Sequence, residues 1–220
     1  MFPRINNKII LIKNGKEHRL FWVKGLKVRF HGSNNRVIFY DKVPYMKHVK
    51  FDMGDSSQIF VKQSKYRIKD LSINAGATNV TVNIGEDFSI ESGKFDFHGE
   101  PDSVIDIGDD CQFGCNISLD TADGHTIYDM GTKEVLNGQK DIKISSHVWL
   151  CENVSVLKGA TIAENSVVGK NSLVTSKLDT PNSIYVGSPA VRLENPKYSN
   201  CNWAREAIKT FIKGEKGFKN

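Results

Sequence analysis

The chain lacks a long apolar run, and this absence bounds the classes of protein to which it can belong. No stretch of about 18 consecutive apolar residues occurs among its 220 residues, so we expect no transmembrane segment. Residues 1–22 contain neither a long hydrophobic core nor the small-residue cleavage site of a signal peptide. We therefore expect these first residues to belong to the mature protein.

Cysteine is scarce and shows no paired framework. The four cysteines are scattered, which favours a reducing, cytoplasmic setting, and they are Cys111, Cys115, Cys151 and Cys201. Cys111 and Cys115 have the spacing of half a zinc site, but no second pair follows at zinc-ligand spacing. We expect both to be small buried residues, and we expect no metal site.

Recognisable nucleic-acid-binding motifs are also absent, although the charge is unevenly distributed. Residues 1–80 contain 16 Lys and Arg against 5 Asp and Glu, residues 81–195 contain 8 against 18, and residues 196–220 contain 6 against 2. The basic residues of the first third come singly among strand-like residues, so we expect no nucleic acid partner. Three interpretations stay open: a solvated basic face, an electropositive surface that guides an acidic partner, and charge matching between neighbouring parts or subunits.

What the sequence does contain is a six-residue period of aliphatic residues. The main run is Ile144, Leu150, Val156, Ile162, Val168 and Val174, and shorter runs are Ile107, Phe113 and Leu119, and Ile84 and Ile90. Neither a helix nor a simple alternating strand has this period. Short strands joined by tight turns do, because three such units close a triangular coil of about 18 residues. We predict an all-β solenoid with these residues pointing inward and with turns at Asn153, Gly159, Asn165 and Asn171.

The remaining segments set the domain organisation. Residues 1–80 alternate apolar and polar positions, and we expect irregular β coils continuous with the solenoid. Residues 81–195 are the repeat region, interrupted by a loop at 120–143. In residues 196–220 we expect a short C-terminal helix after an N-cap at Asn202. Its apolar face would contain Trp203, Ala207, Ile208, Phe211 and Ile212.

The interruption between Leu119 and Ile144 contains the stretch DTADGHTIYDM, with a single histidine, His125. Loops on a rigid scaffold are where binding and catalytic residues concentrate. A surface histidine is nevertheless more often merely solvated, so the loop alone does not assign a role to His125.

Three stretches together give the sequence a specific resemblance. DGHTIYD, then SHVWL, then the six-residue repeats closed by NSIYVGSPAVRL resemble the hexapeptide-repeat acyltransferases, in particular the branch that acetylates sugars and polysaccharides. The resemblance covers residues 84–195 well and residues 1–80 weakly. It implies a left-handed parallel β-helix with an extruded catalytic loop. It also implies a homotrimer with its active site between subunits, and acetyl-coenzyme A as the co-substrate.

The resemblance assigns His125 as the catalytic residue and places an aromatic residue, Trp149, close to it. A neutral imidazole can take the proton of a sugar hydroxyl while the oxygen attacks a thioester, so a direct transfer needs no cysteine nucleophile. Asp123, Asp120 or a backbone carbonyl could orient the ring, while Asp123 before Gly124 also fits an ordinary turn. Trp149 precedes the inward Leu150 and should point outward. It would then line the acetyl or acceptor pocket, or pack under the loop.

The resemblance also implies a set of coenzyme A contacts near the end of the repeats. These are Gly169, Lys170, Thr175, Lys177, Tyr185 and Arg192. The family's usual patterns are altered here, since Gly169-Lys170-Asn171 and Thr175-Ser176-Lys177 replace them. Individual contacts therefore stay less certain than the location of the site.

The function expected from the sequence is an acetyl-coenzyme A-dependent O-acetyltransferase. The acceptor would be a sugar hydroxyl of a surface polysaccharide, including an acidic capsule, or of its precursor. The alternatives are N-acetylation of a nucleotide-linked amino sugar, O-acetylation of serine, and a non-catalytic solenoid that binds a polyanion. A carbonic anhydrase on the same solenoid would need three converging histidines, for which His98, His125 and His147 are the candidates in the repeat region.

Overall fold

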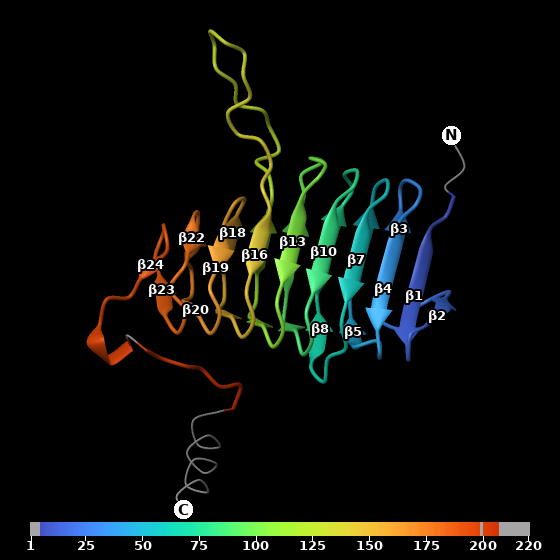
Figure 1. Ribbon diagram of the computed structural model, residues 1–220, viewed down its shortest axis with the longest axis horizontal. Coiled ribbons are helices and arrows are strands. Elements are labelled where there is room, and N and C mark those ends of the chain that lie inside the picture. Colours follow the sequence, from blue (N-terminus) through green and yellow to red (C-terminus); the bar gives the residue numbers. More distant parts are fainter. Residues whose placement is uncertain (1–4, 199, 207–220) are drawn as a thin grey trace, which may run out of the picture.

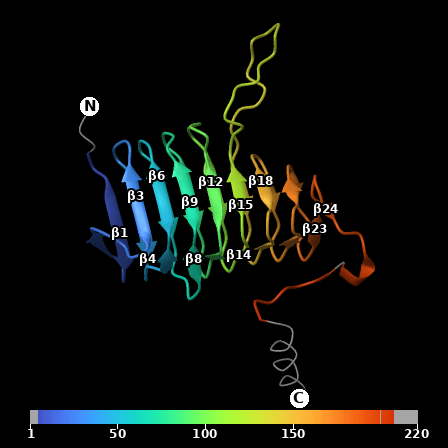
Figure 2. The ribbon, with the colours of Figure 1, turned by 180° about the vertical axis from the view of Figure 1, so that it is seen from behind.

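Each six-residue step of the repeat carries the chain from one side of a three-sided coil to the next. The computed structural model describes residues 5–198 and 200–206, and Figures 1 and 2 show them wound into a β solenoid. Within this part of the chain the strands form three sheets, which we call A, B and C, and the chain visits them repeatedly in the order B, A, C.

The sheets lie along the three sides of the solenoid. In spatial order, sheet A contains β2 (Lys16–Leu20), β1 (Lys8–Lys13), β4 (Arg36–Tyr40), β7 (Gln58–Val61), β10 (Thr81–Ile84), β13 (Val104–Ile107), β16 (Ile142–Ile144), β19 (Thr161–Ile162) and β22 (Lys177–Leu178). Sheet B contains β3 (Leu26–Phe30), β6 (Val49–Met53), β9 (Leu71–Ala75), β12 (Gly93–Asp96), β15 (Ile117–Asp120), β18 (Ser155–Leu157) and β21 (Leu173–Val174). Sheet C contains β5 (Tyr45–Lys47), β8 (Arg67–Lys69), β11 (Ser89–Ile90), β14 (Gln112–Phe113), β17 (Trp149–Leu150), β20 (Val167–Val168), β23 (Ile184–Val186) and β24 (Val191–Arg192).

Coil length changes along the solenoid, and this explains where the six-residue period is visible. In sheet B, Phe51 pairs with Ile73, 22 residues later, whereas Val156 pairs with Val174, only 18 residues later. The steps from A to C and from C to B stay close to six residues in both halves: Ile107, Phe113 and Leu119 are six apart, while Val61, Ile68 and Ile73 are seven and five apart. The additional residues of the N-terminal coils lie at the corner between sheets B and A, so the period is interrupted there.

The inward residues of the period form the core, as predicted. Each residue of the main run has at most 1% of its surface exposed. The longer N-terminal coils enclose a wider interior, which is filled by completely buried aromatic rings, including Phe51, Phe88, Phe95 and Phe97. Phe88 packs edge-on against Phe113, with ring centroids 5.0 Å apart. The narrower C-terminal coils are filled by Val, Ile and Leu.

The predicted turn residues have the left-handed backbone conformation that tight corners require. Asn153, Gly159, Asn165 and Asn171 have φ values of 58°, 77°, 51° and 61°. Asparagine tolerates this region better than most residues. At the corner between sheets C and B, the Nδ2 of Asn116 donates to Asn153 Oδ1 over 3.0 Å, and Asn153 Nδ2 donates to Asn171 Oδ1 over 2.9 Å. These bonds connect successive coils outside the sheets.

Both ends of the solenoid carry an antiparallel strand. β2 turns back along β1 at the N-terminal end of sheet A, and β24 turns back along β23 at the C-terminal end of sheet C. The neighbouring pairs between them, from β1–β4 onward, are parallel. The described part of the chain contains no helix long and apolar enough to cross a bilayer.

The tail and one cysteine differ from the predictions. A short 3-10 turn, η1 (Pro196–Tyr198), is followed by residues 200–206 without helical structure, so among the described residues the predicted helix does not begin at its N-cap, Asn202. The rest of the predicted helix, residues 207–212, lies outside the described residues. The expectation that both closely spaced cysteines are buried is wrong for Cys115, which is exposed, and confirmed for Cys111. Burial raises the pKa of the Cys111 thiol to about 12, so this thiol is not a nucleophile at neutral pH.

Candidate active site

The loop that carries His125 is an arm that leaves the solenoid at the corner between sheets B and A. It connects β15 to β16, and Figure 1 shows it projecting far beyond the other corners. A bridge between Tyr128 and Val135 closes the arm into a narrow hairpin, in which the Leu136 N–H donates to the Ile127 carbonyl over 2.8 Å. The arm thus has its own backbone order and places His125 near its base.

Asn137 connects the two sides of the arm at His125. Its Nδ2 donates to the His125 carbonyl over 2.8 Å, and its Oδ1 accepts from the Ile127 N–H over 2.7 Å. The His125 side chain is exposed, and among the described residues no hydrogen bond occupies its ring. The ring is therefore presented to whatever lies beside the arm.

Asp123 fastens the base of the arm to the solenoid. Its carboxylate pairs with Lys158 Nζ at 2.5 Å and accepts from Asn137 Nδ2 over 2.8 Å. The contact with Lys158 has the larger effect, and together with the bond from Asn137 it lowers the pKa of the Asp123 carboxyl below its ordinary value. Lys158 also donates to the Asn137 carbonyl over 2.6 Å. In the described structure Asp123 thus contacts residues that hold the arm rather than the ring of His125.

A second histidine, His98, lies in the coil directly before the arm. Its Nε2 is 2.8 Å from Asp120 Oδ1, and Asp120 also accepts from the Ser118 hydroxyl. A Cβ at Gly124 would lie 3.5 Å from His98 Nδ1, so the imidazole lies against the base of the arm. His98 was not among the residues predicted for this site. The signal available was that it precedes Asp120 by 22 residues, two fewer than the coil between Asp96 and Asp120.

Trp149 points outward from the coil, as predicted, but on a different side of the solenoid from the arm. It belongs to β17 in sheet C, which lies opposite the corner between sheets B and A. Its neighbour is the tail rather than the loop, since the rings of Trp149 and Trp203 have centroids 6.0 Å apart. Figures 1 and 2 show the arm and the tail leaving on opposite sides. One chain therefore does not bring Trp149 and His125 together.

The residues expected to contact coenzyme A are distributed over two sides of the C-terminal coils. Gly169 follows β20 on sheet C, and Arg192 lies on β24 at the edge of the same sheet. Lys170 pairs with Glu152 at 2.5 Å. Thr175 and Lys177 are exposed beside sheet A.

Tyr185 points inward and is only 3% exposed. Its hydroxyl donates to the Thr180 carbonyl over 2.8 Å and accepts from the Thr180 N–H over 3.0 Å. Both polar contacts of the phenol are therefore made within the chain.

The three histidines of the repeat region do not converge on one point. His98 lies at the base of the arm, His125 on the arm, and His147 on the sheet C side, where its ring stacks on Trp203. Within the described residues, no group of three or more His, Cys, Asp or Glu is placed to hold a metal ion.

Comparison with known proteins relates part of the chain to acetyltransferases. No family model matches the chain. A polysialic acid O-acetyltransferase of Escherichia coli is 34% identical over 113 residues, which cover 51% of this chain and 35% of that protein. A galactoside O-acetyltransferase of Lactococcus lactis is 36% identical over 91 residues, which cover 41% of this chain and 42% of that protein. The matched regions thus span less than half of these relatives' own lengths.

A solved structure extends the similarity over the whole fold. The crystal structure of the polySia-specific acetyltransferase NeuO aligns with 97% of this chain and 95% of its own, with a TM-score of 0.66 and 23% identity. The chain is thus similar in part of its sequence to O-acetyltransferases that act on sugars, and it shares the β-solenoid fold of one of them. The agreement in fold includes the N-terminal coils, where the six-residue period is broken.

Proposed function

We propose that the protein is an acetyl-coenzyme A-dependent O-acetyltransferase that modifies a hydroxyl group of a polysaccharide or of its precursor, with His125 as the general base. The observation that carries the proposal is the exposed imidazole on an ordered arm, at the corner where the coils are most strongly interrupted. The similarity to O-acetyltransferases of polysialic acid and of galactosides supports a sugar hydroxyl as acceptor.

The reaction is a direct transfer between two bound substrates. The His125 ring takes the proton of the acceptor hydroxyl as its oxygen bonds to the acetyl carbonyl carbon of the thioester. The carbon–sulfur bond breaks, and the imidazolium returns the proton to the departing sulfur. Holding both substrates beside one base lowers the entropic cost of bringing the reacting atoms together.

A site built from two copies of the chain accounts for the separation of His125 and Trp149. The arm leaves at the corner opposite sheet C, so the two residues can face each other only when they come from different molecules. This supports a homotrimer of left-handed solenoids, with the arm of one subunit lying across sheet C of the next. Trp149 would then form a wall opposite the base.

Acetyl-coenzyme A, the co-substrate, supplies the acetyl group as a reactive thioester. Its extended pantetheine chain would lie along the C-terminal half of sheet C. At Gly169 a Cβ would come within 2.8 Å of Val186 Cγ1, so a larger residue would disturb this surface. Gly169, Lys170 and Arg192 would flank it, and Thr175 and Lys177 would contribute from the neighbouring subunit. Tyr185 would support the site from inside the coil, because its hydroxyl is bonded to Thr180.

The proposal is tested by the release of coenzyme A from acetyl-coenzyme A, measured with a thiol reagent, over a panel of sugar, amino-sugar and serine acceptors. We expect release with a sugar hydroxyl acceptor, and we expect His125→Ala to reduce kcat by about 100-fold or more. His48→Ala removes another exposed histidine, in the N-terminal coils, and is the matched control.

Equal release by the wild type and His125→Ala with every acceptor would refute the proposal. Release with amino sugars alone would indicate N-acetylation. Binding of polyanions without any release would indicate a scaffold.

A further inference from the structure

Sheet C carries a column of outward side chains that leads to Trp149 from the N-terminal end. The strand registers place Tyr45, Arg67, Ser89, Gln112 and Trp149 at equivalent positions on β5, β8, β11, β14 and β17. Neighbouring strands lie about 4.8 Å apart. The column therefore extends about 19 Å along the solenoid axis, enough for several linked sugar residues.

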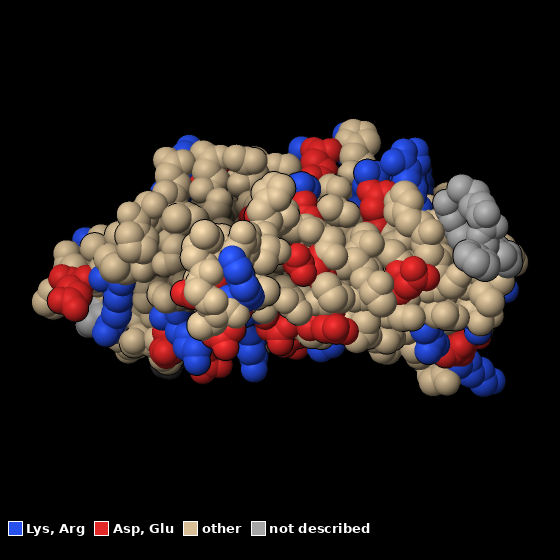
Figure 3. Space-filling model, turned by 90° about the horizontal axis from the view of Figure 1, so that it is seen from above, with Lys and Arg blue, Asp and Glu red and all other residues tan. Residues whose placement is uncertain are grey.

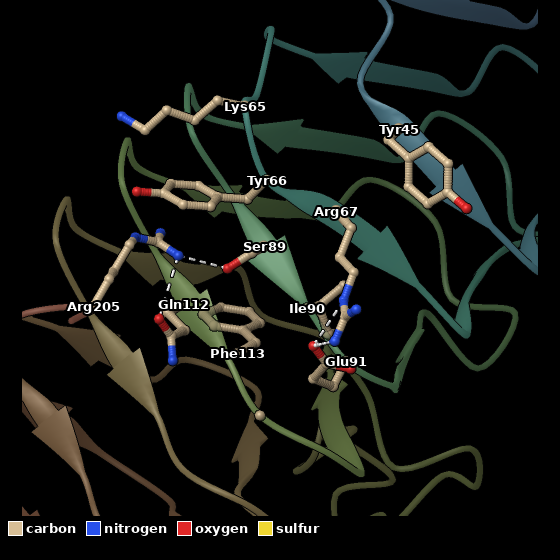
Figure 4. Close-up of a pocket in the computed structure, with 11 residues that line it drawn as sticks. Tyr45, Lys65, Tyr66, Arg67, Ser89, Ile90, Glu91, Gln112, Phe113 and Arg205 are labelled. Atoms are coloured by element: carbon tan, nitrogen blue, oxygen red, sulfur yellow. Dashed lines mark hydrogen bonds and ion pairs between the residues drawn. The ribbon is translucent and has the colours of Figure 1, made fainter. Parts of the chain in front are cut away.

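Three adjoining depressions follow this column. The first, of about 540 Å³, is lined by Trp22, Lys24, Lys42, Tyr45 and Lys65, among others. The second, also about 540 Å³, contains Tyr45, Tyr66, Arg67, Gln112 and Arg205 (Figure 4). The third, about 910 Å³, contains Tyr66, His147, Trp149, Trp203 and Arg205.

Shared walls join the depressions into one groove. Lys65 lines all three, Tyr45 lines the first two, and Tyr66 and Arg205 line the last two. We call this continuous depression the sheet C groove. It begins at Trp22 and ends at Trp149, beside the proposed reacting centre.

Exposed aromatic rings mark the distant part of the groove. Trp22 is 73% exposed and Tyr45 is 62% exposed. Large exposed aromatic residues along a depression are typical of binding surfaces. Flat rings of this kind pack against the C–H face of a pyranose ring, and their N–H and O–H groups remain available to its hydroxyls.

The charged residues of the groove indicate which kind of polysaccharide it can bind. The first depression is lined by three lysines, Lys24, Lys42 and Lys65, and by no acidic residue. In the described structure neither Lys24 nor Lys42 has an ion-pair partner, while Lys65 pairs with Asp87 at 2.7 Å. Arg67 in the second depression is paired with Glu91 at 2.6 Å. The unneutralised positive charge is thus concentrated at the end of the groove furthest from Trp149.

The opposite side of the molecule has a different character. Seen from the side where the arm leaves, Lys and Arg are interspersed with Asp and Glu (Figure 3). Several basic residues of the N-terminal coils are also neutralised locally, since Arg29 and Lys50 both lie beside Asp52. The positive excess of residues 1–80 therefore does not form one uniform basic face.

We infer that the sheet C groove binds an acidic polysaccharide chain over several consecutive sugar residues. Carboxylates of the chain lie against Lys24 and Lys42, sugar rings stack on Trp22 and Tyr45, and a residue further along is presented beside Trp149. The presentation of a sugar residue beside Trp149 for reaction rests on the proposed function. The acceptor is then a polymer, recognised at a distance from the atoms that react.

The test compares acidic and neutral acceptors of graded length. With sialic acid oligomers from the dimer upward, we expect KM to fall as the chain lengthens and then to level off once the groove is filled. Neutral galactose oligomers should show a much weaker dependence. The KM for long acidic oligomers should rise steeply with salt, because exposed charges are screened.

Two variants sharpen the test. One variant combines Lys24→Glu with Lys42→Glu, and the other is Tyr45→Ala. Each should raise the KM for long acidic oligomers about tenfold. The KM for long oligomers should then no longer be lower than that for short ones. Lys8→Glu combined with Lys27→Glu is the matched control, because these exposed lysines lie on sheets A and B of the same coils. We expect this control to keep the full advantage of long chains.

Binding of the same oligomers, carrying a fluorescent label, is measured separately by anisotropy without acetyl-coenzyme A. Binding that depends on Lys24, Lys42 and Tyr45 in a protein that acetylates none of these oligomers would support the groove and contradict the proposed function. Acetylation with a KM independent of chain length, and unchanged by the groove variants, would overturn the groove and leave the proposed function intact. A length dependence that is equal for neutral and acidic oligomers would refute the acidic specificity.

Discussion

The guanidinium group of Arg205 lies over the ring of Tyr66, with its central carbon 4.0 Å from the ring centroid. The same group donates to Asp110 over 2.9 Å, to the Ser89 hydroxyl over 2.7 Å, and to the backbone carbonyls of Asp87 and Cys111 over 2.9 Å and 3.0 Å. Only 13% of the Arg205 side chain is exposed. A residue near the end of the described chain is thus anchored on coils formed about a hundred residues earlier, and it holds Trp203 against His147 and Trp149.

Arg205→Ala should release this segment from sheet C. The change removes the donor to Asp110 Oδ1, to the Ser89 hydroxyl and to the Asp87 carbonyl, at a cost of about 2 kcal/mol. Opening of the segment would become about 30-fold more frequent. Hydrogen exchange of the amides of Cys201 and Trp203 measures this directly. Arg29→Ala is the control, since that arginine forms only an exposed pair 4.0 Å long. Unchanged exchange in Arg205→Ala would show that the contacts do not hold the tail.

Mixing two inactive variants should restore activity if the active site lies between subunits. His125→Ala and Trp149→Ala are each expected to lose most of their activity. When they are unfolded together and refolded, some interfaces combine an intact His125 with an intact Trp149 from a neighbouring copy. Coenzyme A release from the mixture should then exceed the sum of the two variants severalfold. Failure to exceed that sum, with mixed oligomers demonstrated by light scattering and mass labelling, would show that His125 and Trp149 do not form one site between subunits.

The buried carboxylate of Asp96 should make stability depend on acid pH. Burial raises the pKa of this carboxyl, but the hydrogen bonds from Lys94 and from the His98 N–H outweigh it and bring the pKa below its ordinary value. Because the pKa is lower in the folded state, the stabilisation is fully present above the unfolded pKa of about 3.9 and is lost as pH falls through the folded value. The difference in unfolding free energy between wild type and Asp96→Asn should narrow below about pH 4.

Denaturant unfolding of both proteins across this range measures the effect. A difference that stays constant from neutral pH to about pH 3 would contradict it. Because Asp96 also fixes the His98 backbone beneath the arm, the variant should raise the exchange rate of the Thr121 amide as well, which bonds to the Asp96 carbonyl over 3.1 Å.

Two glycines with similar backbone angles should respond very differently to alanine. Gly25 has φ of +82°, and a Cβ there would lie 1.9 Å from the Met46 carbonyl oxygen. Gly15 has φ of +71° with open space around it. We expect Gly15→Ala to cost about 1 kcal/mol from backbone strain alone. Gly25→Ala should cost 4 kcal/mol or more, or prevent folding, because backbone must move. Soluble yield and thermal unfolding compare them, and equal effects would show that the close approach at Gly25 is easily relieved.

The fold of residues 144–174 could be predicted from the sequence because every inward residue there follows the same six-residue spacing. Each coil there has its minimal length, so Ile144 and Val174 both follow the same spacing and both point inward. The coils before them add residues at a single corner, which shifts the period without changing the fold. The shift is not visible locally, because the residues from Gly76 to Val80 look like any other turn.

The candidate site was predicted less completely than the repeats, because several of its contacts join residues that are far apart in the sequence. His125 was recognisable because a break in a regular repeat is a local signal. Lys158 and Asn137, which hold the arm, gave no such signal, since each acquires its role only when the arm folds back onto the solenoid. The contacts of the tail were also not predictable from the neighbouring sequence. Trp203 fits an amphipathic helix by its spacing, but its contacts with His147 and Trp149 are made across more than fifty residues of chain.

The two antiparallel end strands also determine how molecules of this shape can meet. An open stack of parallel strands would offer each end of the solenoid as a template for another copy, and fibres could grow head to tail. Here β2 closes one sheet at the first end and β24 closes a different sheet at the other. At each end of the solenoid, one of the three sheets ends in an antiparallel strand and the other two end in parallel strands. A second copy that approached along the axis could not continue the hydrogen bonding of all three sheets in one register. Association is thereby directed to the flanks, where the arm and sheet C lie.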